Sequence, residues 1–413
     1  MADTTLKGSL AGTPKGALGG LRVLDLSRVL AGPLAAQILA DLGADVIKVE
    51  REGRGDDSRE WAPPFMSPQP EDPLDESAYF WTCNRGKRSI AIDIASGEGA
   101  GLVARLAAGC DVLIENYKVG TLARYGLDYA TLSRDNPGLI YCSITGFGQT
   151  GPYSARPGYD TIVQAMGGLM SITGNPDGTA GAGPRKTGVA MADQMTALYA
   201  TIAILAAVNE RHASGLGQFI DMALLDVQVA ALSNLGMNYL ATGKVPQRGG
   251  NRLTTVYPSD NFRCSDGDIM VIVGNDGQFR RMCEALGLAG VAADPRFARN
   301  EARLRHVEEL ALLIGRAMAT RTIAECQALL DDAGVPAGPI NNVQQVFADP
   351  QVVERGVVRE LGEAGGRPVR IIANPIRLSR TPPTYLRPPP KLGEHGEEIL
   401  REVLGQVNLS SRT

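Results

Sequence analysis

The sequence predicts an α/β protein, in which a Rossmann-like doubly wound large domain is followed by a smaller α+β domain. Three observations lead to this prediction. Short apolar runs of strand type alternate with segments of helical apolar spacing from residue 21 onward. The 413 residues give room for two domains, since a typical domain has about 100–200 residues. A polar stretch at 242–259, with three glycines and two prolines, separates this alternation from a segment of different pattern.

The first strand–helix–strand unit lies near the amino terminus. Leu21–Leu26 is a short apolar run, Ala31–Leu42 has the apolar spacing of a helix, and Asp45–Glu50 is predicted as a second strand. These elements fit within about 30 residues, so they form a βαβ unit with parallel strands and a right-handed crossover. The same order recurs further along the chain, with strands and helices predicted at Arg88–Ile94, Gly97–Ala108, Asp111–Glu115, Leu122–Leu132 and Gly138–Ile144.

Longer helices follow this repeating pattern. We predict a helix at Asp193–Ala213, a strand at Phe219–Met222 and a further apolar helix at Leu224–Ala241. From residue 261 a short hairpin precedes helices rich in Ala, Leu and Arg. The predicted organisation is a flexible tail at 1–20, a large α/β domain at 21–224, a linker at 225–260, a small domain at 261–333, a second linker at 334–347 and a C-terminal segment at 348–413.

Composition excludes several classes of protein. The formal net charge of -4 argues against binding to nucleic acid or to an anionic membrane, because both need a basic face. The longest nearly apolar run, Met195–Val208, is shorter than the ~20 residues of a spanning helix, and residues 1–20 lack the apolar core of a signal peptide. The six cysteines are widely spread without a CxxC pair, so we expect reduced thiols in a cytoplasmic protein.

Several common catalytic patterns are absent from the sequence. The three histidines, His212, His306 and His395, have no partner at metal-ligand spacing, so no metal site is predicted. The chain has no GxSxG elbow and no phosphate-binding GxxxxGK[ST] loop. The turn after the first predicted strand, Ser27–Pro33, reads SRVLAGP instead of the GxGxxG of dinucleotide-binding proteins. Carboxylates, basic residues and glycine-rich turns remain as candidates for chemistry.

Polar residues follow several of the predicted strands. Arg51, Asn116, Lys118 and the loop Gly146–Tyr153 all come directly after a strand. In an open α/β sheet, ligands bind beyond the carboxyl ends of the strands, so these residues are candidates to line one cleft. Arg51, Lys118 and Arg124 are suited to binding phosphate groups. The alternative is that each is a solvated surface charge, and spacing alone leaves both interpretations open.

Asp193 opens the long apolar helix and has two interpretations. Asp is among the preferred residues at a helix N-cap, which is the simpler explanation. A carboxylate at this end of a helix is also kept ionised by the helix dipole. An ionised carboxylate can act as a covalent nucleophile, and the sequence pattern does not choose between a cap and a nucleophile.

Taken together, the motifs of this sequence resemble those of the class III CoA transferases, a family that includes formyl-CoA, carnitine-CoA and succinyl-CoA-dependent transferases. The resemblance extends from Gly20 to Leu404 and depends on the number, order and spacing of the motifs. They are Leu21–Pro33, Leu42–Arg51, Gly55–Trp61, Asn84–Asp93, Asp111–Gly126, Ser143–Asp160, Gln164–Gly174, Gly217–Asp226 and Leu392–Leu400.

The resemblance implies a fold and a mechanism. Family members have a large CoA-binding Rossmann-like domain and a smaller domain, the C-terminal segment returns to the large domain, and two chains interlock as a homodimer. The family's nucleophilic aspartate corresponds to Asp193, which attacks a thioester to give a mixed anhydride and then an aspartyl-CoA thioester. Acyl-CoA and a carboxylic acid are the substrates, and no cofactor beyond coenzyme A and no metal is expected.

The resemblance also implies binding residues. The family's contacts with the adenine and phosphates of CoA correspond to Leu30, Ala31, Arg51, Ile92, Asn116, Tyr117, Lys118 and Arg124. Tyr159 corresponds to a tyrosine near the reacting thioester, and Trp61 to a tryptophan at the substrate pocket. Formyl-CoA transferase has a glutamine at the position of Leu30 and a glycine-rich loop where this chain has 252–262, so formyl or oxalyl chemistry is not expected.

Two other functions stay open at this point. α-Methylacyl-CoA racemases share the fold and have a His-Asp pair where this chain has Tyr159 and Asp160. Racemisation needs an acid and a base on opposite faces of the α-carbon. This chain has Tyr159 in place of the histidine, which disfavours a racemase. A catalytically silent CoA-binding protein is the second alternative, and the retained Asp193 argues against it. We expect transfer of CoA from an acyl-CoA such as succinyl-CoA to a small carboxylic or dicarboxylic acid.

Overall fold

The computed structural model describes residues 16–64, 66, 76–253, 255–364 and 367–402. Most of the predicted tail at 1–20 therefore lies outside the described residues. The described part of the chain divides into two compact units. The first comprises residues 16–168, 188–236 and 355–402, and the second comprises residues 169–187 and 237–354. No comparison tests the predicted domain boundaries, which stay predictions.

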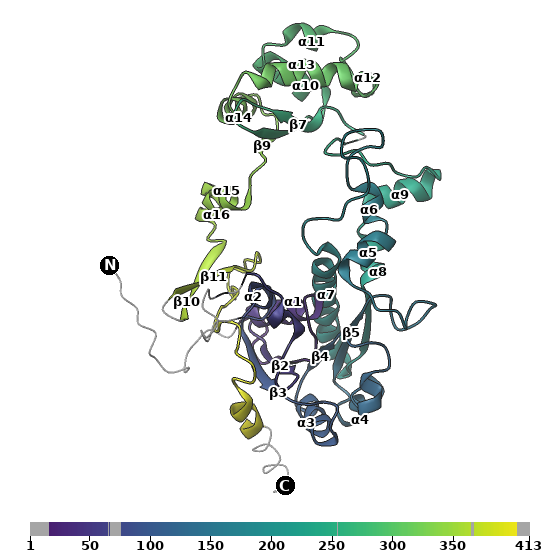
Figure 1. The fold of residues 1–413 in the computed structure, drawn as a ribbon, viewed down its shortest axis with the longest axis vertical. Coiled ribbons are helices and arrows are strands. Elements are labelled where there is room, and N and C mark those ends of the chain that lie inside the picture. The colour runs from purple at the N-terminus through teal and green to yellow at the C-terminus, as the bar shows by residue number, and fades with distance from the viewer. Residues whose placement is uncertain (1–15, 65, 67–75, 254, 365–366, 403–413) are drawn as a thin grey trace, which may run out of the picture. The chain divides into compact units, whose positions relative to one another are not determined.

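A six-stranded parallel sheet forms the centre of the first unit, in the order β3-β2-β1-β4-β5-β6 (Figure 1). The order reverses between β1 and β4, which makes their carboxyl ends the switch point where a crevice opens. The strands are β1 Arg22–Asp25, β2 Asp45–Glu50, β3 Lys87–Ala91, β4 Val112–Glu115, β5 Ile140–Thr145 and β6 Phe219–Ala223.

Helices cover both faces of this sheet, and each face has its own core. Side chains of successive strand residues point to opposite faces, so Val23 lies in one core and Leu24 in the other. Helices α1 and α7 pack on the first face, while α3, α4 and the C-terminal Ile399 pack on the second (Figure 1). The predicted doubly wound α/β fold is therefore confirmed.

The helical elements of the first unit connect these strands. They are α1 Ala31–Asp41, η1 Asp57–Glu60, α2 Ala78–Cys83, α3 Gly97–Ala108, η2 Leu122–Tyr125, α4 Tyr129–Asp135, α5 Asp160–Met166, α7 Met191–Ser214 and α8 Leu224–Ala230. The unit also contains the antiparallel hairpin of β10 Val358–Ala364 and β11 Arg367–Ile372. Arg88 on β3 forms ion pairs with Glu398 and Glu402, which attaches the end of the described chain to the sheet.

Helix α7 is long and apolar enough to cross a membrane when judged by length and composition alone, and no other helix in the described ranges passes that test. In the structure Ala197, Ala200 and Ile204 of α7 are fully buried in the core that it shares with α1 and the sheet. The core helix of a globular unit has the same composition, so this feature is weak evidence for a membrane span.

Two predicted helices are divided in the structure. The segment predicted as a single helix at Leu122–Leu132 forms η2 and then α4, with Gly126 at a φ of 68° between them. The segment predicted as a single helix at Leu224–Ala241 forms α8 and then α9, Ser233–Thr242. The break between α8 and α9 has a local cause, because Ser233 has a φ of 50°, in the left-handed region that a continuing right-handed helix does not allow.

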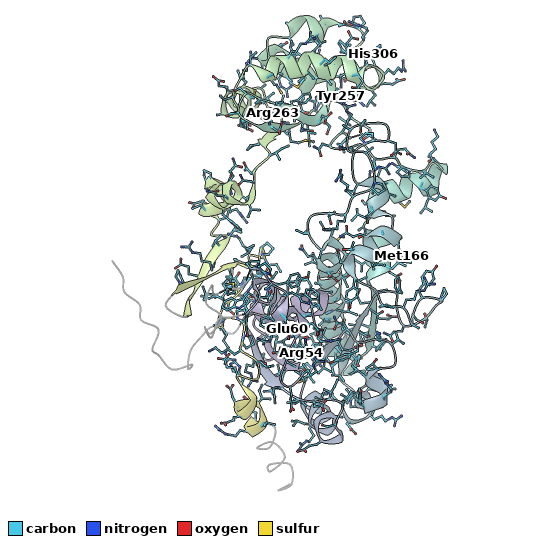
Figure 2. All side chains as sticks on the ribbon, viewed as in Figure 1. Arg54, Glu60, Met166, Tyr257, Arg263 and His306 are labelled. Carbon is cyan, nitrogen blue, oxygen red and sulfur yellow. The ribbon has the colours of Figure 1, made fainter. Side chains whose placement is uncertain are left out.

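The second unit is a small mixed structure with its own core. The three-stranded antiparallel sheet packs against helices through Phe262, Val271, Phe279 and Ile314. Its elements are α6 Leu169–Ile172, β7 Ser259–Arg263, β8 Asp268–Ile272, α10 Asp276–Ala285, α11 Ala289–Ala293, α12 Asn300–Arg305, α13 Val307–Ala319, α14 Ile323–Asp332, β9 Ala337–Pro339, α15 Val343–Ala348 and α16 Pro350–Glu354. Figure 2 labels Tyr257, Arg263 and His306 of this unit.

Candidate active site

Two cavities open at the carboxyl ends of β1 and β4, within the first unit. The first, here called the Asp193 cavity, has a volume of about 180 Å³ and includes Asp193 and Tyr159 in its lining. The second, the Arg51 cavity, has a volume of about 200 Å³ and includes Arg51 and Ile92. Their position is the one expected for a ligand in an open α/β sheet.

Most of the predicted site residues line these two cavities. The Asp193 cavity is lined by the predicted residues Leu30, Ala31, Asn116, Tyr117, Lys118, Tyr159 and Asp193. Tyr117 also lines the Arg51 cavity, together with the predicted Arg51 and Ile92. The structure thus brings together residues that lie up to 163 positions apart in the chain, from Leu30 to Asp193.

Two of the predicted residues lie outside both linings. Arg124 lies on η2, where its guanidinium is 5.9 Å from the ring centre of Tyr125, a residue of the Arg51 cavity. Trp61 is 44% exposed and packs edge-on against Tyr79 at 5.2 Å. The geometry therefore supports neither as a wall of these cavities.

Asp193 lies in the first turn of α7 but does not cap it, so the cap interpretation is wrong. The N-cap residue is Ala190, whose side chain makes no capping bond. Asp160, at the start of α5, supplies the missing acceptor. Its Oδ1 accepts hydrogen bonds from the backbone N–H groups of Ala192 at 2.8 Å and of Asp193 at 3.3 Å. The carboxylate of Asp160 thus fixes the first turn of α7, which contains Asp193.

The environment of Asp193 raises the pKa of its carboxyl group, so that the neutral and the ionised form are both populated near neutral pH. The side chain is partly exposed to its cavity, but its removal from bulk water together with the nearby charge of Asp160 raises the pKa of Asp193 to about 7. The expectation that the helix dipole keeps the group fully ionised is therefore wrong near neutral pH. Tyr79 lies close enough for Asp193 and Asp160 to add to the effect of burial in raising the pKa of its phenol.

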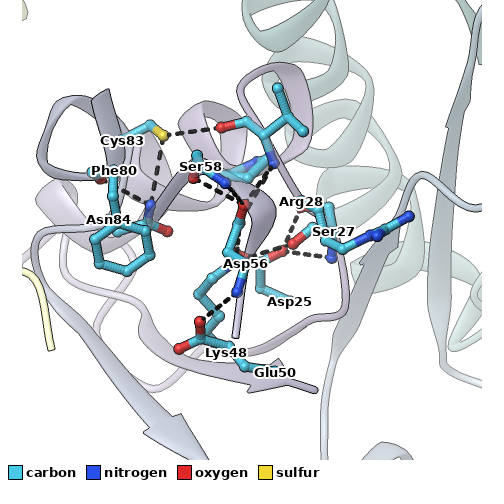
Figure 3. Close-up of polar contacts among 12 residues, drawn as sticks. Asp25, Ser27, Arg28, Lys48, Glu50, Asp56, Ser58, Phe80, Cys83 and Asn84 are labelled. Carbon is cyan, nitrogen blue, oxygen red and sulfur yellow. Dashed lines mark hydrogen bonds and ion pairs between the residues drawn. The ribbon is translucent and has the colours of Figure 1, made fainter. Parts of the chain in front are cut away.

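Buried ion pairs lie beneath the loop that follows β1 (Figure 3). Lys87 Nζ donates to Asp25 Oδ2 at 2.7 Å, and both side chains are fully buried. Lys48 Nζ donates to Asp56 Oδ2 and to the carbonyl oxygen of Ser27, each at 2.9 Å. A charge withdrawn from water is tolerated when it is paired and hydrogen-bonded, as these are.

Asp56 also holds the backbone of this loop. Its Oδ1 accepts the N–H groups of Val29 at 3.1 Å and of Ser58 at 2.9 Å. Val29 has a φ of 74°, which is unfavourable for a β-branched residue and persists only where the surroundings fix it. The loop that places Leu30 and Ala31 in the Asp193 cavity is therefore fixed by buried acceptors.

Asn116 bridges the loops after β4 and β1. Its Oδ1 accepts the backbone N–H of Arg28 at 2.9 Å, and its Nδ2 donates to the carbonyl oxygen of Arg28 at 2.7 Å. Both polar ends of the predicted ligand contact thus bind protein backbone. The geometry makes Asn116 a residue that positions Arg28.

Three residues of this region were not predicted. Arg28 and Asp160 belong to motifs that carry the family resemblance, at Leu21–Pro33 and Ser143–Asp160, but no pattern pointed to their individual contacts. Asp160 contacts backbone groups 32 and 33 residues away, which no local rule anticipates. Tyr79 had no sequence signal at all.

Comparison with known proteins identifies the family. The model of CoA-transferase family III matches residues 18–396. This chain belongs to that family. Among curated family III relatives, a succinate–glutarate CoA-transferase from Agrobacterium fabrum is 50% identical over 386 residues, which cover 94% of this chain and 95% of the relative. A succinyl-CoA:glutarate CoA-transferase from Mus musculus is 42% identical over 387 residues, covering 94% and 86%.

A solved structure agrees with this assignment. A CAIB/BAIF family protein from Brucella suis superimposes with a TM-score of 0.85 at 47% identity, covering 94% of this chain and 100% of that chain. The predicted family is therefore confirmed, and this family III chain is a CoA-transferase. The roles of its individual site residues stay predictions.

Proposed function

We propose that this chain transfers CoA from succinyl-CoA to a small dicarboxylic acid, with glutarate as the first acceptor to test. The relatives described above act, by their names, on succinate or succinyl-CoA and glutarate. The observation that carries the mechanism is the carboxylate of Asp193, which lines a cavity at the switch point and is largely withdrawn from bulk water. A carboxylate with few water molecules around it is a stronger nucleophile than a solvated one.

The first half of the proposed reaction loads CoA onto the enzyme. The Asp193 carboxylate attacks the thioester carbonyl of succinyl-CoA and the C–S bond breaks. The CoA thiolate departs, and a succinyl-aspartyl anhydride is formed. The thiolate then attacks the aspartyl carbonyl, which forms an aspartyl-CoA thioester and releases succinate as its carboxylate. Each bond broken is replaced by one formed, and no net proton transfer is needed.

The second half repeats these steps in reverse with the acceptor. A glutarate carboxylate attacks the aspartyl thioester and displaces the CoA thiolate. The thiolate then attacks the glutaryl carbonyl of the new anhydride, which gives glutaryl-CoA and regenerates Asp193. The side chain itself carries the acyl group, so we propose that coenzyme A is the only cofactor-like molecule required and that no metal takes part.

We also propose that the chain forms a homodimer. Helices α5, α7 and α8 together expose the apolar side chains Ile162, Met166, Leu198, Tyr199, Ile202 and Val229, each between 44% and 61% exposed; Figure 2 labels Met166. An apolar surface of this kind is typical of a protein–protein interface. Light scattering should give twice the chain mass of 43.7 kDa, and a mass of 43.7 kDa would rule the dimer out.

A cytoplasmic location is the remaining proposal. All six cysteines are buried free thiols. Reduced cysteines are the rule in the cytosol, where thiols are kept reduced. Fractionation of cells that express the chain with a tag tests this location, and recovery in a secreted or membrane fraction would contradict it.

An exchange panel tests the transfer. Purified protein is mixed with succinyl-CoA and, one at a time, malonate, succinate labelled with ¹³C, glutarate, adipate and acetate, and the CoA esters are resolved by mass spectrometry. We expect glutaryl-CoA to form fastest, since a difference of one methylene is worth about 1–3 kcal/mol in a fitted pocket. Absence of any new ester with the intact protein would contradict the proposal.

The Asp193→Ala variant serves as the control. It should form none of the new esters, which would assign the exchange to this carboxylate. Deuterium uptake at the α-carbon of a 2-methylacyl-CoA, without exchange of CoA, would show that the protein is a racemase instead.

A further inference from the structure

Arg28 stands at the junction of the two cavities. Only Arg28 and Tyr117 line both the Asp193 cavity and the Arg51 cavity among the residues that the structure describes. Figure 3 shows the Arg28 side chain directed away from the buried cluster around Asp56. A positive charge therefore borders both cavities, so a ligand with one end in each cavity would extend past Arg28.

The chain holds Arg28 more firmly than an ordinary surface arginine. Asn116 binds both its backbone N–H and its carbonyl oxygen, as described above. The guanidinium lies 5.2 Å from the ring centre of Tyr117 and donates through Nη1 to Asp57 Oδ2 at 2.8 Å. Asp57 accepts from Nη1, whereas Nε, on the opposite edge of the guanidinium, has no hydrogen-bond partner.

The hydrogen-bonding capacity of Arg28 is incomplete. Its Nε is buried without a hydrogen-bond partner, although the side chain as a whole is 41% exposed. A buried donor without an acceptor is unfavourable, and this cost is recovered when the guanidinium turns that edge toward an acceptor. Arginine binds phosphate in a bidentate manner through two N–H groups of the same fork.

We propose that Arg28 binds the pyrophosphate of CoA; this inference extends the proposed function. A donor whose thioester reaches Asp193 and whose adenosine occupies the Arg51 cavity must carry its pyrophosphate across the junction that Arg28 lines. Asp57 is then a positioning residue, which holds the guanidinium while its free edge binds the phosphate oxygens.

Calorimetric titration of the full-length protein tests this assignment without relying on turnover. The ligands are CoA, 3′-dephospho-CoA, which retains the pyrophosphate, and pantetheine, which lacks all phosphate. Arg28→Met should weaken binding of CoA and of 3′-dephospho-CoA by about 10- to 100-fold and leave binding of pantetheine within about 2-fold, because a hydrogen bond to a charged group is worth about 1.5–3 kcal/mol. Arg28→Lys should recover part of the loss, and Asp57→Asn should cause a smaller loss of the same pattern.

Arg54→Met is the matched control for the loss of one positive charge. Arg54 forms an exposed ion pair with Glu60 in the neighbouring segment and lines neither cavity (Figure 2). The Arg54→Met variant should bind all three ligands with the affinities of the unmodified protein.

Three outcomes would overturn the assignment. An equal loss for pantetheine would mean that Arg28 supports the fold or the acyl end of the ligand. A loss that disappears with 3′-dephospho-CoA would place the 3′-phosphate at Arg28, and no loss at all would leave it a surface charge. If the protein forms no new CoA ester in the exchange panel but binds CoA as predicted, the proposed function is contradicted and the assignment of Arg28 to the pyrophosphate stands.

Discussion

Carboxylates are withdrawn from water in two regions of the first unit, but their neighbours differ. Beneath β1–β3, burial alone would raise the pKa of Asp25, Glu50 and Asp56, yet the adjacent Lys87, Lys48 and Arg59 outweigh it and hold each pKa below its usual value. These carboxylates are locked as anions in ion pairs. They stabilise the loop after β1, which lines the Asp193 cavity.

In the second region no lysine or arginine contributes to the pKa of the carboxyl groups of Glu115 and Asp193. Burial raises the pKa of Glu115 to about 7, against weaker opposing hydrogen bonds from Ser143 and Tyr117. Removal from water together with the charge of Asp160 raises the pKa of Asp193 to about 7 as well. Burial thus leaves a carboxylate ionised where a lysine or arginine is paired with it, and raises its pKa toward neutrality where no cation opposes the burial.

The largest loss of activity is expected from replacing Asp193, and a comparison with Glu115 shows whether position or burial is responsible. Asp193→Asn keeps the shape of the side chain but removes the nucleophile, so kcat for CoA transfer should fall by at least about 10⁴-fold. Glu115→Gln removes a carboxyl group of similar pKa outside the Asp193 cavity, and its kcat should stay within about 10-fold. Steady-state kinetics decides, and comparable losses in both variants would show that withdrawal from water, and not the position of Asp193, is what matters.

The next effect concerns stability on the ion-paired side. Lys87 Nζ donates to Asp25, Asn84 and the carbonyl oxygen of Pro33. Lys87→Met leaves the Asp25 carboxylate buried without its partner, which should lower the free energy of unfolding by about 3–5 kcal/mol. Urea unfolding followed by circular dichroism measures the loss.

The exposed ion pair of Arg54 and Glu60 provides the comparison for this loss. Arg54→Met should cost less than about 1 kcal/mol. A loss of that size in Lys87→Met would mean that the buried pair contributes no more than a surface pair.

A smaller effect appears in the pH dependence of stability. The pKa of Asp193 is about 7 in the folded chain against a usual 3.8, so the folded state holds this proton more tightly and stability is lost as the pH rises from about 4 to 7. Asp193→Asn does not titrate. Its stability relative to the unmodified protein should therefore improve by about 2 kcal/mol between pH 5.5 and pH 8.5, since one pKa unit corresponds to 1.36 kcal/mol. Thermal unfolding at the two pH values checks this, and a constant difference would contradict the raised pKa.

The smallest effect comes from the acid beside the nucleophile. Asp160→Asn keeps an oxygen that can accept the backbone N–H groups of Ala192 and Asp193 but removes the charge. The pKa of Asp193 should fall, and the acidic limb of the kcat/KM profile should move to lower pH by roughly half a pH unit or more. An unchanged profile would mean that burial alone sets this pKa.

Much of the fold could be predicted because it follows from local patterns. Alternating strand and helix periodicity placed the first βαβ unit and the recurring strands, and the structure has them in a doubly wound sheet. The division of the helix after residue 224 was not predictable, because the left-handed φ of Ser233 has no sequence signature in a serine. The grouping of residues 169–187 with the second unit depends on contacts distant in sequence and was equally hidden.

The candidate site was only partly predictable for the same reason. Asp193 came from the family resemblance, since its pattern fitted a helix cap equally well. The structure gives the capping role to Asp160, which lies 33 residues away. Asn116 was predicted as a ligand contact, whereas its side chain binds the backbone of Arg28, 88 residues away. Side-chain partners at such separations are determined by tertiary packing and leave no local pattern.

Detection of CoA bound covalently to Asp193 tests directly whether this carboxylate is the nucleophile. The protein is mixed with succinyl-CoA without acceptor, quenched in acid within seconds, digested and examined by mass spectrometry. We expect a CoA thioester on the peptide that contains Asp193, removable by hydroxylamine and absent from Asp193→Asn. A protein that exchanges CoA between acids while this peptide stays unmodified, or while the adduct lies on another residue, would contradict it.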